Sequence, residues 1–158
     1  MKIGITGHQN LESNETWVRD VLREIIVGLK AQEGLTSLAR GTDQIFAGIL
    51  SDLRLPYVAV IPCSLYVDTF ESPAIRKQYL AFLKKASRVM TLNLEKPEGI
   101  AFYEAGKKVV ELSDRMIAVW DGQKAKHLGG TADAVEYSLA IKREIIHINP
   151  VTRKISNL

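Results

Sequence analysis

The sequence predicts an α/β fold, namely a three-layer αβα sandwich around a mostly parallel β-sheet. The first observation behind this prediction is that short apolar runs, typical of strands, alternate with amphipathic helical patterns along the chain. The second is that short links join these segments, and repeated strand–helix–strand units build a parallel sheet with helices on both faces. The third is the lack of any linker, internal repeat or low-complexity segment, so residues 1–158 are expected to form a single domain.

Six strands are expected, each marked by a run of apolar or β-branched residues. In chain order they are Lys2–Thr6, Leu35–Leu38, Tyr57–Ile61, Arg88–Leu92, Met116–Val119 and Glu144–Ile148. The uninterrupted apolar character of Tyr57–Ile61 indicates a strand that is buried on both faces. After the last strand, the polar tail Asn149–Leu158 is expected to pack or fray.

Five helices are expected between these strands. Their ranges are Ser13–Ala31, Gly41–Leu53, Pro73–Lys85, Ile100–Leu112 and Thr131–Ile141. In the first of them, apolar residues recur at helical spacing from Trp17 to Leu29 and form one stripe. Ser13 is its expected N-cap and Gly34 its expected stop.

Composition and charge narrow the classes of function. The net charge of +3, from 21 basic and 18 acidic residues, is too small and too dispersed to predict nucleic-acid binding. Cys63 is the only cysteine, so an intramolecular disulfide is excluded, a reducing compartment is indicated and a structural thiol is expected. The three histidines lack metal-ligand spacing, so neither a metal nor a cofactor is expected. The N-terminus lacks a signal-peptide pattern and no apolar run approaches the ~20 residues of a membrane span, so a cytoplasmic protein without membrane contact is expected.

Three polar loops directly follow predicted strands, where ligands of open α/β sheets bind. The residues singled out in these loops are Gly7 and His8, then Arg40, Gly41, Thr42 and Asp43, and finally Trp120, Asp121, Gly129, Gly130 and Thr131. A weaker cluster, Tyr66–Phe70, follows the third strand and forms either a lid over a ligand or ordinary aromatic packing.

Several of these residues have a predicted function, and for some of them a structural alternative remains open. Gly129–Thr131 is expected to bind phosphate, because free backbone N–H groups and the helix dipole converge at the start of a helix. Arg40 is the expected anion clamp, since a guanidinium holds phosphate through two parallel hydrogen bonds. Trp120 would stack on a base, and Asp121 would accept hydrogen bonds from ribose hydroxyls. The structural alternatives are a cap in a tight turn for His8, a solvated side chain for Arg40 and a cover of the sheet edge for Trp120.

Taken together, these motifs resemble the SLOG superfamily, which unites the DNA-processing protein A fold with the LOG phosphoribohydrolases. The resemblance rests on three segments in the family's order, namely Gly4–His8, Leu38–Asp43, and Ser113–Gly122 followed by Gly129–Thr131. It implies a Rossmann-like domain that binds nucleotides or nucleotide-derived ligands at its glycine-rich loops, often as a homodimer.

One departure from the family pattern concerns catalysis. LOG hydrolases share a glutamate three residues after the threonine of their glycine-rich motif. In this chain, Ala134 occupies that position. Asp133 and Glu136 lie two and five residues after Thr131, and because each helical residue turns about 100°, neither side chain takes the same direction.

The leading hypothesis is therefore a sensor or binding protein for a small nucleotide-like ligand. The alternative is an N-glycosidase acting on a nucleoside 5′-monophosphate, in which Asp133 or Glu136 would stabilise the developing oxocarbenium ion or position water. A single-stranded DNA binder is disfavoured by the near-neutral charge, so nucleic acid is not an expected partner.

Overall fold

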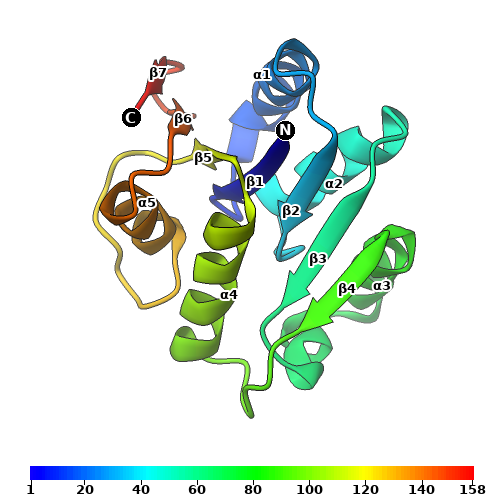
Figure 1. The fold of residues 1–158 in the computed structure, drawn as a ribbon. Helices are drawn as coiled ribbons and strands as arrows, with labels where there is room; N and C mark the ends of the chain where they lie inside the picture. The colour runs from blue at the N-terminus through cyan, green and yellow to red at the C-terminus, as the bar shows by residue number, and fades with distance from the viewer.

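Seven strands form one sheet in the order β4-β3-β2-β1-β5-β6-β7 in the computed structural model, which describes all 158 residues (Figure 1). The strands are β1 (Lys2–Gly7), β2 (Glu33–Thr36), β3 (Tyr57–Ile61), β4 (Arg88–Thr91), β5 (Arg115–Val119), β6 (Ile145–Ile148) and β7 (Ile155–Asn157). Neighbouring strands are parallel except β7, which runs antiparallel to β6. The predicted mostly parallel sheet is confirmed.

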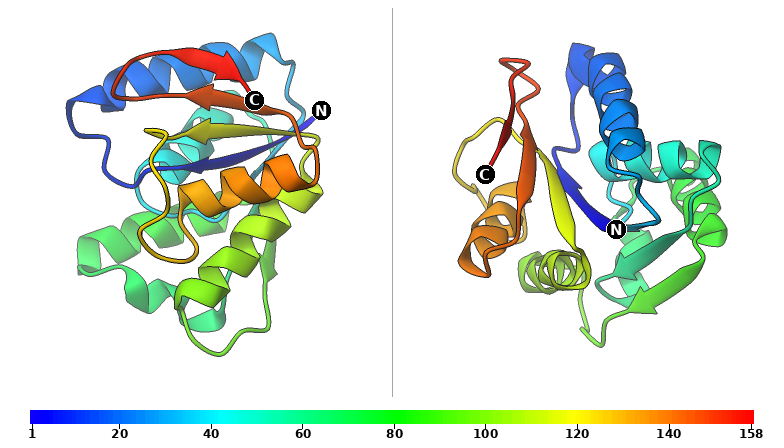
Figure 2. Two further views of the ribbon diagram at one scale, coloured as in Figure 1. Left: turned by 90° about the vertical axis from the view of Figure 1, so that its left-hand side faces the viewer. Right: turned by 45° about the horizontal axis from the view of Figure 1, so that its top comes forward.

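Helices cover both faces of this sheet (Figures 1 and 2). They are α1 (Glu15–Gly28), α2 (Thr42–Asp52), α3 (Pro73–Lys85), α4 (Gly99–Leu112) and α5 (Thr131–Ala140), together with the short 3-10 helices η1 (Glu12–Asn14) and η2 (Ser64–Thr69). The first three α-helices lie on one face, and α4 and α5 lie together on the other. Each layer encloses its own apolar core, which explains why β3, lying between both cores, is fully buried as predicted.

The order of the strands reverses at β1. β2 pairs with one edge of β1 and β5 with the other, so the loops that leave the carboxyl ends of β1 and β5 diverge. Ligands of open α/β sheets bind at such a switch point. None of the helices combines the length and the apolar character that a membrane span requires.

The first helix differs from its predicted range at both ends. Ser13 lies in η1 and Asn14 precedes α1, so Ser13 is not the N-cap. Lys30 adopts a left-handed φ of 52°, and the Ala31 N–H donates to Ile26 O at 3.3 Å, so a Schellman motif ends the helix. The predicted stop at Gly34 is wrong, since that glycine lies inside β2.

Two further differences concern strands. Leu38 was expected in the second strand but has a left-handed φ of 56°, and its N–H donates to the Thr36 hydroxyl. The tail packs as the edge strand β7, because the Asn149 side chain accepts from the Val151 and Thr152 amides and turns the chain back along β6. The remaining predicted boundaries agree with the structure within one or two residues.

Candidate functional site

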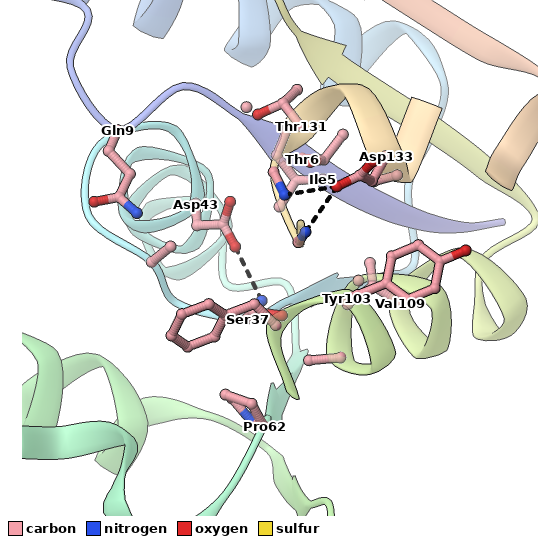
Figure 3. Close-up of a pocket in the computed structure, with 18 of the residues that line it drawn as sticks. Ile5, Thr6, Gln9, Ser37, Asp43, Pro62, Tyr103, Val109, Thr131 and Asp133 are labelled. Carbon is pink, nitrogen blue, oxygen red and sulfur yellow. Dashed lines mark hydrogen bonds between the residues drawn. The ribbon is translucent and has the colours of Figure 1, made fainter. Parts of the chain in front are cut away.

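A cavity of about 470 Å³ opens at the carboxyl ends of β1, β2 and β3, beside the strand-order reversal (Figure 3). We call it the main cavity. Its lining residues come from the β1 end (Ile5, Thr6, Gly7, His8, Gln9), the loop between β2 and α2 with the first turn of that helix (Ser37, Ala39, Arg40, Asp43), the region after β3 (Pro62, Tyr66, Thr69, Phe70), α4 (Phe102, Tyr103, Ala105, Gly106, Lys107, Val109) and the start of α5 (Gly129, Gly130, Thr131, Asp133, Ala134). All three predicted loops therefore meet at one place.

A second cavity of about 670 Å³, the outer cavity, lies against the loop between β5 and α5. Trp120, Asp121 and the cations Lys124 and Lys126 line it. The two cavities share one wall, formed by His8, Gln9, Gly129, Gly130 and Thr131. The residues predicted for base and ribose, Trp120 and Asp121, are thus separated from the main cavity by the predicted phosphate loop.

Gly41 and Thr42 fasten the β1 loop to α2 and line neither cavity. The Thr42 amide and hydroxyl both donate to His8 O, at 3.2 and 2.8 Å. Gly41 has a φ of 77°, and a Cβ there would stand 2.1 Å from Gln9 O. Gly7 lines the main cavity with its backbone pressed against the Thr42 side chain. These residues shape the main cavity rather than offer groups to a ligand.

Asp43 belongs to the lining of the main cavity and is only 5% exposed. Its Oδ2 accepts from the Thr36 hydroxyl at 2.9 Å and from the Ser37 amide at 3.0 Å. Burial raises its pKa to about 6, although these hydrogen bonds favour the charged form. A buried carboxyl with a perturbed pKa in a cavity is typical of functional sites.

His8 and Asp121 connect the ends of β1 and β5. His8 Nε2 accepts from the Asp121 amide at 3.0 Å and lies 3.2 Å from Asp121 Oδ1. The pKa of Asp121 is lowered mainly by the Gln123 amide, which donates to Asp121 Oδ1, and to a smaller extent by the His8 ring. The Trp120 ring packs against the His147 ring, with the ring centroids 5.4 Å apart, and the indole N–H donates to Gln123 O. Asp121 and Trp120 therefore have structural partners of their own.

The backbone amides predicted to hold phosphate already have an acceptor. Asp133 Oδ2 accepts from the Gly129 amide at 2.7 Å and from the Gly130 amide at 3.2 Å (Figure 3). The amides of Thr131, Ala132 and Asp133, in the first turn of α5, make no hydrogen bond. An anion at this helix start would therefore meet these three amides and, beside them, the Asp133 carboxylate.

The two predicted catalytic carboxylates are placed differently. Asp133 lines the main cavity, whereas Glu136 is exposed and borders neither cavity. Glu136 lies one helical turn beyond Asp133, so its side chain starts farther from the cavity that opens at the beginning of α5. Arg40 lines the main cavity, is exposed and forms no salt bridge, as an anion clamp requires.

Sequence reasoning missed the contribution of α4. Phe102, Tyr103 and Lys107 from this helix form one wall of the main cavity. The Lys107 ammonium lies 3.0 Å from Glu104 and 5.1 Å from the centre of the Tyr103 ring, and its hydrogen bond to Glu104 raises its pKa. The available signal was the spacing of Tyr103 and Lys107, four residues apart and hence on one helix face.

The aromatic cluster after β3 packs instead of forming a lid. The Phe70 ring stacks on Tyr79 with centroids 4.3 Å apart, and Tyr66 meets both rings edge-on. Tyr66 and Phe70 are 6% and 4% exposed, and burial raises the pKa of Tyr66. The cluster forms a fixed apolar part of the cavity wall.

No protein-family model matches the sequence, and no curated protein matches it either. Among solved structures, DNA processing protein A from Streptococcus pneumoniae is similar, with a TM-score of 0.67 at 17% identity over 94% of this chain and 50% of that chain. DNA processing protein A from Helicobacter pylori, described in a single-stranded DNA binding mode, gives a TM-score of 0.68 at 19% identity over 94% of this chain and 65% of that chain. The structural-genomics target TM1055 gives 0.59 at 14% identity over 92% and 72% of the two chains.

This chain thus spans half the length of the Streptococcus protein and less than two thirds of the Helicobacter protein. At these identities the likeness concerns the fold. The chain has the Rossmann-like α/β fold of DNA processing protein A, as its resemblance to the SLOG superfamily implies.

Proposed function

We propose that the protein binds a small nucleotide-like ligand in the main cavity. The observation that carries the proposal is the convergence of all three predicted loops on one cavity of about 470 Å³ at the strand-order reversal. This volume lies within the roughly 300–1,000 Å³ that is usual for small-molecule sites. We also propose the homodimer that the family resemblance implies.

The chemistry of the lining suits the two ends of a nucleotide. Phe70, Phe102 and Tyr103 offer aromatic surface to a base. Arg40 and Lys107 supply positive charge for a phosphate, together with the unpaired amides in the first turn of α5. Both ends of the ligand would then be recognised within the same cavity.

The geometry favours binding over N-glycosidase activity. Glu136 stands outside the cavity, and Asp133 Oδ2 is engaged by two backbone amides. A general acid or base needs its carboxyl free to reach the ligand. In this arrangement, Asp133 accepts hydrogen bonds at the N-terminus of α5 and has a structural role.

The test is a thermal-shift titration with AMP, GMP, CMP and UMP, run in parallel with an assay for released base. A binding protein gives a shift without base release. Arg40→Ala should reduce the shift, whereas Arg19→Ala, an exposed arginine on α1 paired with Glu15, should leave it unchanged. Absence of a shift with all four nucleotides would refute the proposed function, and base release that Asp133→Ala abolishes would instead establish the glycosidase.

A second candidate function, binding of single-stranded nucleic acid, is favoured by one observation. No acidic residue occurs between Glu71 and Glu95, whereas this segment holds five exposed cations, none of them in a salt bridge: Arg76, Lys77, Lys84, Lys85 and Arg88. The segment that holds α3 and β4 therefore has a local charge of +5, which the total of +3 does not reveal. The single-stranded DNA binding described for the Helicobacter protein of the same fold also weakens the prediction against nucleic acid.

A further inference from the structure

One carboxylate oxygen of Asp43 has no well-aligned hydrogen-bond donor within the protein. Both of its hydrogen bonds, from the Thr36 hydroxyl and the Ser37 amide, reach Oδ2, and they hold the loop between β2 and α2 in place. Figure 3 shows one Asp43 oxygen bonded to Ser37 and the other pointing away from it. Oδ1 accepts no well-aligned hydrogen bond, although the Ala39 and Leu38 amides also help to lower the pKa of the carboxyl, and the carboxylate belongs to the lining of the main cavity.

The two hydrogen bonds to Oδ2 do not in themselves require a carboxylate at this position. A single carbonyl oxygen, such as that of asparagine, would accept both hydrogen bonds that Oδ2 accepts. The charged form of a side chain that is 5% exposed is also costly, and burial raises the pKa of Asp43 to about 6. A second carboxylate oxygen aimed into a cavity therefore indicates a partner that is a hydrogen-bond donor.

The charged groups that line the main cavity differ in sign and in exposure. Arg40 is exposed, whereas Asp43 is 5% exposed, and Lys107 and Asp133 also line the cavity. An ionised carboxylate accepts hydrogen bonds and repels phosphate. The exposed Arg40 and the buried Asp43 thus suit a ligand that carries one anionic group and one hydrogen-bond donor.

We propose that Asp43 is the specificity-determining residue of the main cavity: its Oδ1 accepts a hydrogen bond from a hydroxyl or amino group of a nucleotide that enters with its nucleoside end inward and keeps its phosphate near Arg40. The inference rests on the proposed function and adds the orientation and class of the ligand. The main cavity then takes nucleosides and nucleoside monophosphates, and it disfavours ligands that carry a phosphate at each end.

The test uses two variants that separate ligand recognition from loop stability. Asp43→Asn keeps an oxygen for Thr36 and Ser37 but turns an amide N–H₂ toward the cavity. Thr36→Val removes the hydroxyl that Asp43 holds but leaves Oδ1 in place. Binding is measured by calorimetry with whichever of AMP, GMP, CMP and UMP binds the wild-type protein most tightly.

We expect Asp43→Asn to weaken binding by about tenfold, because charge-assisted hydrogen bonds are roughly twice as strong as neutral ones. Thr36→Val should lower the unfolding midpoint and change the dissociation constant by less than about twofold. Two analogues of the bound nucleotide identify the donor: one lacks both ribose hydroxyls, and the other lacks the donor of the base, which is the exocyclic amino group of AMP, GMP or CMP and N3–H of UMP. For the analogue that lacks the donor, the dissociation constants of the wild-type protein and of Asp43→Asn should be nearly equal.

Two outcomes separate the inference from the proposed function. If a nucleotide binds the wild-type protein and Asp43→Asn with equal affinity, the inference is wrong and the proposed function stands. If none of the four nucleotides binds the wild-type protein, both are wrong.

Discussion

Asp43 illustrates at the scale of one residue how a site can lower the stability of its own fold. Its pKa is about 6 in the folded protein against 3.8 for the unperturbed group, and burial is the main cause. The gap between these values corresponds to about 3 kcal/mol of folding free energy. The pKa of Asp43 is higher in the folded protein than in the unfolded chain. Between pH 3.8 and about 6, Asp43 therefore still holds its proton in the folded protein but has lost it in the unfolded chain.

The stability of the wild-type protein should therefore fall as pH rises from about 4 to about 6.5, by up to about 3 kcal/mol from Asp43 alone. Asp43→Asn cannot ionise and should lack this component. Urea unfolding of both proteins at about pH 4.5, 6 and 7.5 checks the prediction. Parallel curves of unfolding free energy against pH for the two proteins would contradict it.

Gly129 and Gly130 are neighbours with different steric surroundings. Gly129 has a φ of 90°, and a Cβ there would stand 2.6 Å from Phe102 Cβ and 2.7 Å from Gly99 O. At Gly130 the nearest atom is 3.7 Å away. Gly129→Ala should therefore lower the unfolding free energy by at least about 2 kcal/mol, and Gly130→Ala by less than about 1 kcal/mol. Equal losses in chemical denaturation would show that close contact with α4 does not fix this loop.

At the scale of the element, the N-terminus of α5 is of the kind that binds anions, and Asp133 of the same helix supplies the anionic group there. The carboxylate satisfies the amides of Gly129 and Gly130 and places a negative charge beside the free amides of the first turn. A phosphate that approaches this turn is attracted by the amides and repelled by the carboxylate. The balance between the two is set by the charge of a single side chain.

Asp133→Asn keeps an acceptor for the two glycine amides and removes that charge. We expect affinity for a nucleoside monophosphate to rise by about three- to tenfold, while affinity for the same nucleoside without phosphate stays unchanged. The helix should lose about 0.5–1 kcal/mol of stability, since the neutral amide is a weaker partner at a helix start. Calorimetric titration with both ligands measures the effect, and weaker nucleotide binding by the variant would refute this role of Asp133.

The sequence predicted elements better than it predicted the surroundings of side chains. Apolar periodicity located all five α-helices and six strands, but Ile155–Asn157 become a strand only by pairing with β6, which no local pattern records. Gly41 and Gly129, both among the loop residues singled out from the sequence, have positive φ values of 77° and 90°. Their partners, Gln9 and Phe102, come from distant segments and could not be predicted from the loops themselves. The same limitation hid Lys107, whose place in the main cavity depends on how α4 packs.

At the scale of the whole molecule, the small net charge conceals an uneven distribution. The five cations between residues 72 and 94 exceed the total of +3, so the rest of the chain carries a net charge of −2. Lys77 and Lys84 are seven residues apart on α3, hence on the same side of that helix, and the exposed Leu80 lies between them. α3 begins next to Phe70 in the wall of the main cavity, so this basic surface leads away from the proposed nucleotide site.

A strand of nucleic acid along this surface would contact it mainly through phosphates, so binding should depend steeply on salt. We expect fluorescence anisotropy with a single-stranded oligonucleotide to show binding that weakens by at least about tenfold between about 50 and 200 mM salt. The double variant Lys77→Glu, Lys84→Glu should weaken binding by at least about tenfold at the lower salt concentration and flatten the salt dependence. Lys154→Glu makes the same kind of charge reversal at an exposed lysine beside β7 and should have little effect. If both charge reversals reduce binding equally, the attraction depends on net charge and α3 is not a nucleic-acid surface. If the wild-type protein does not bind at low salt, the second candidate function is excluded. The main cavity alone then carries the proposed activity.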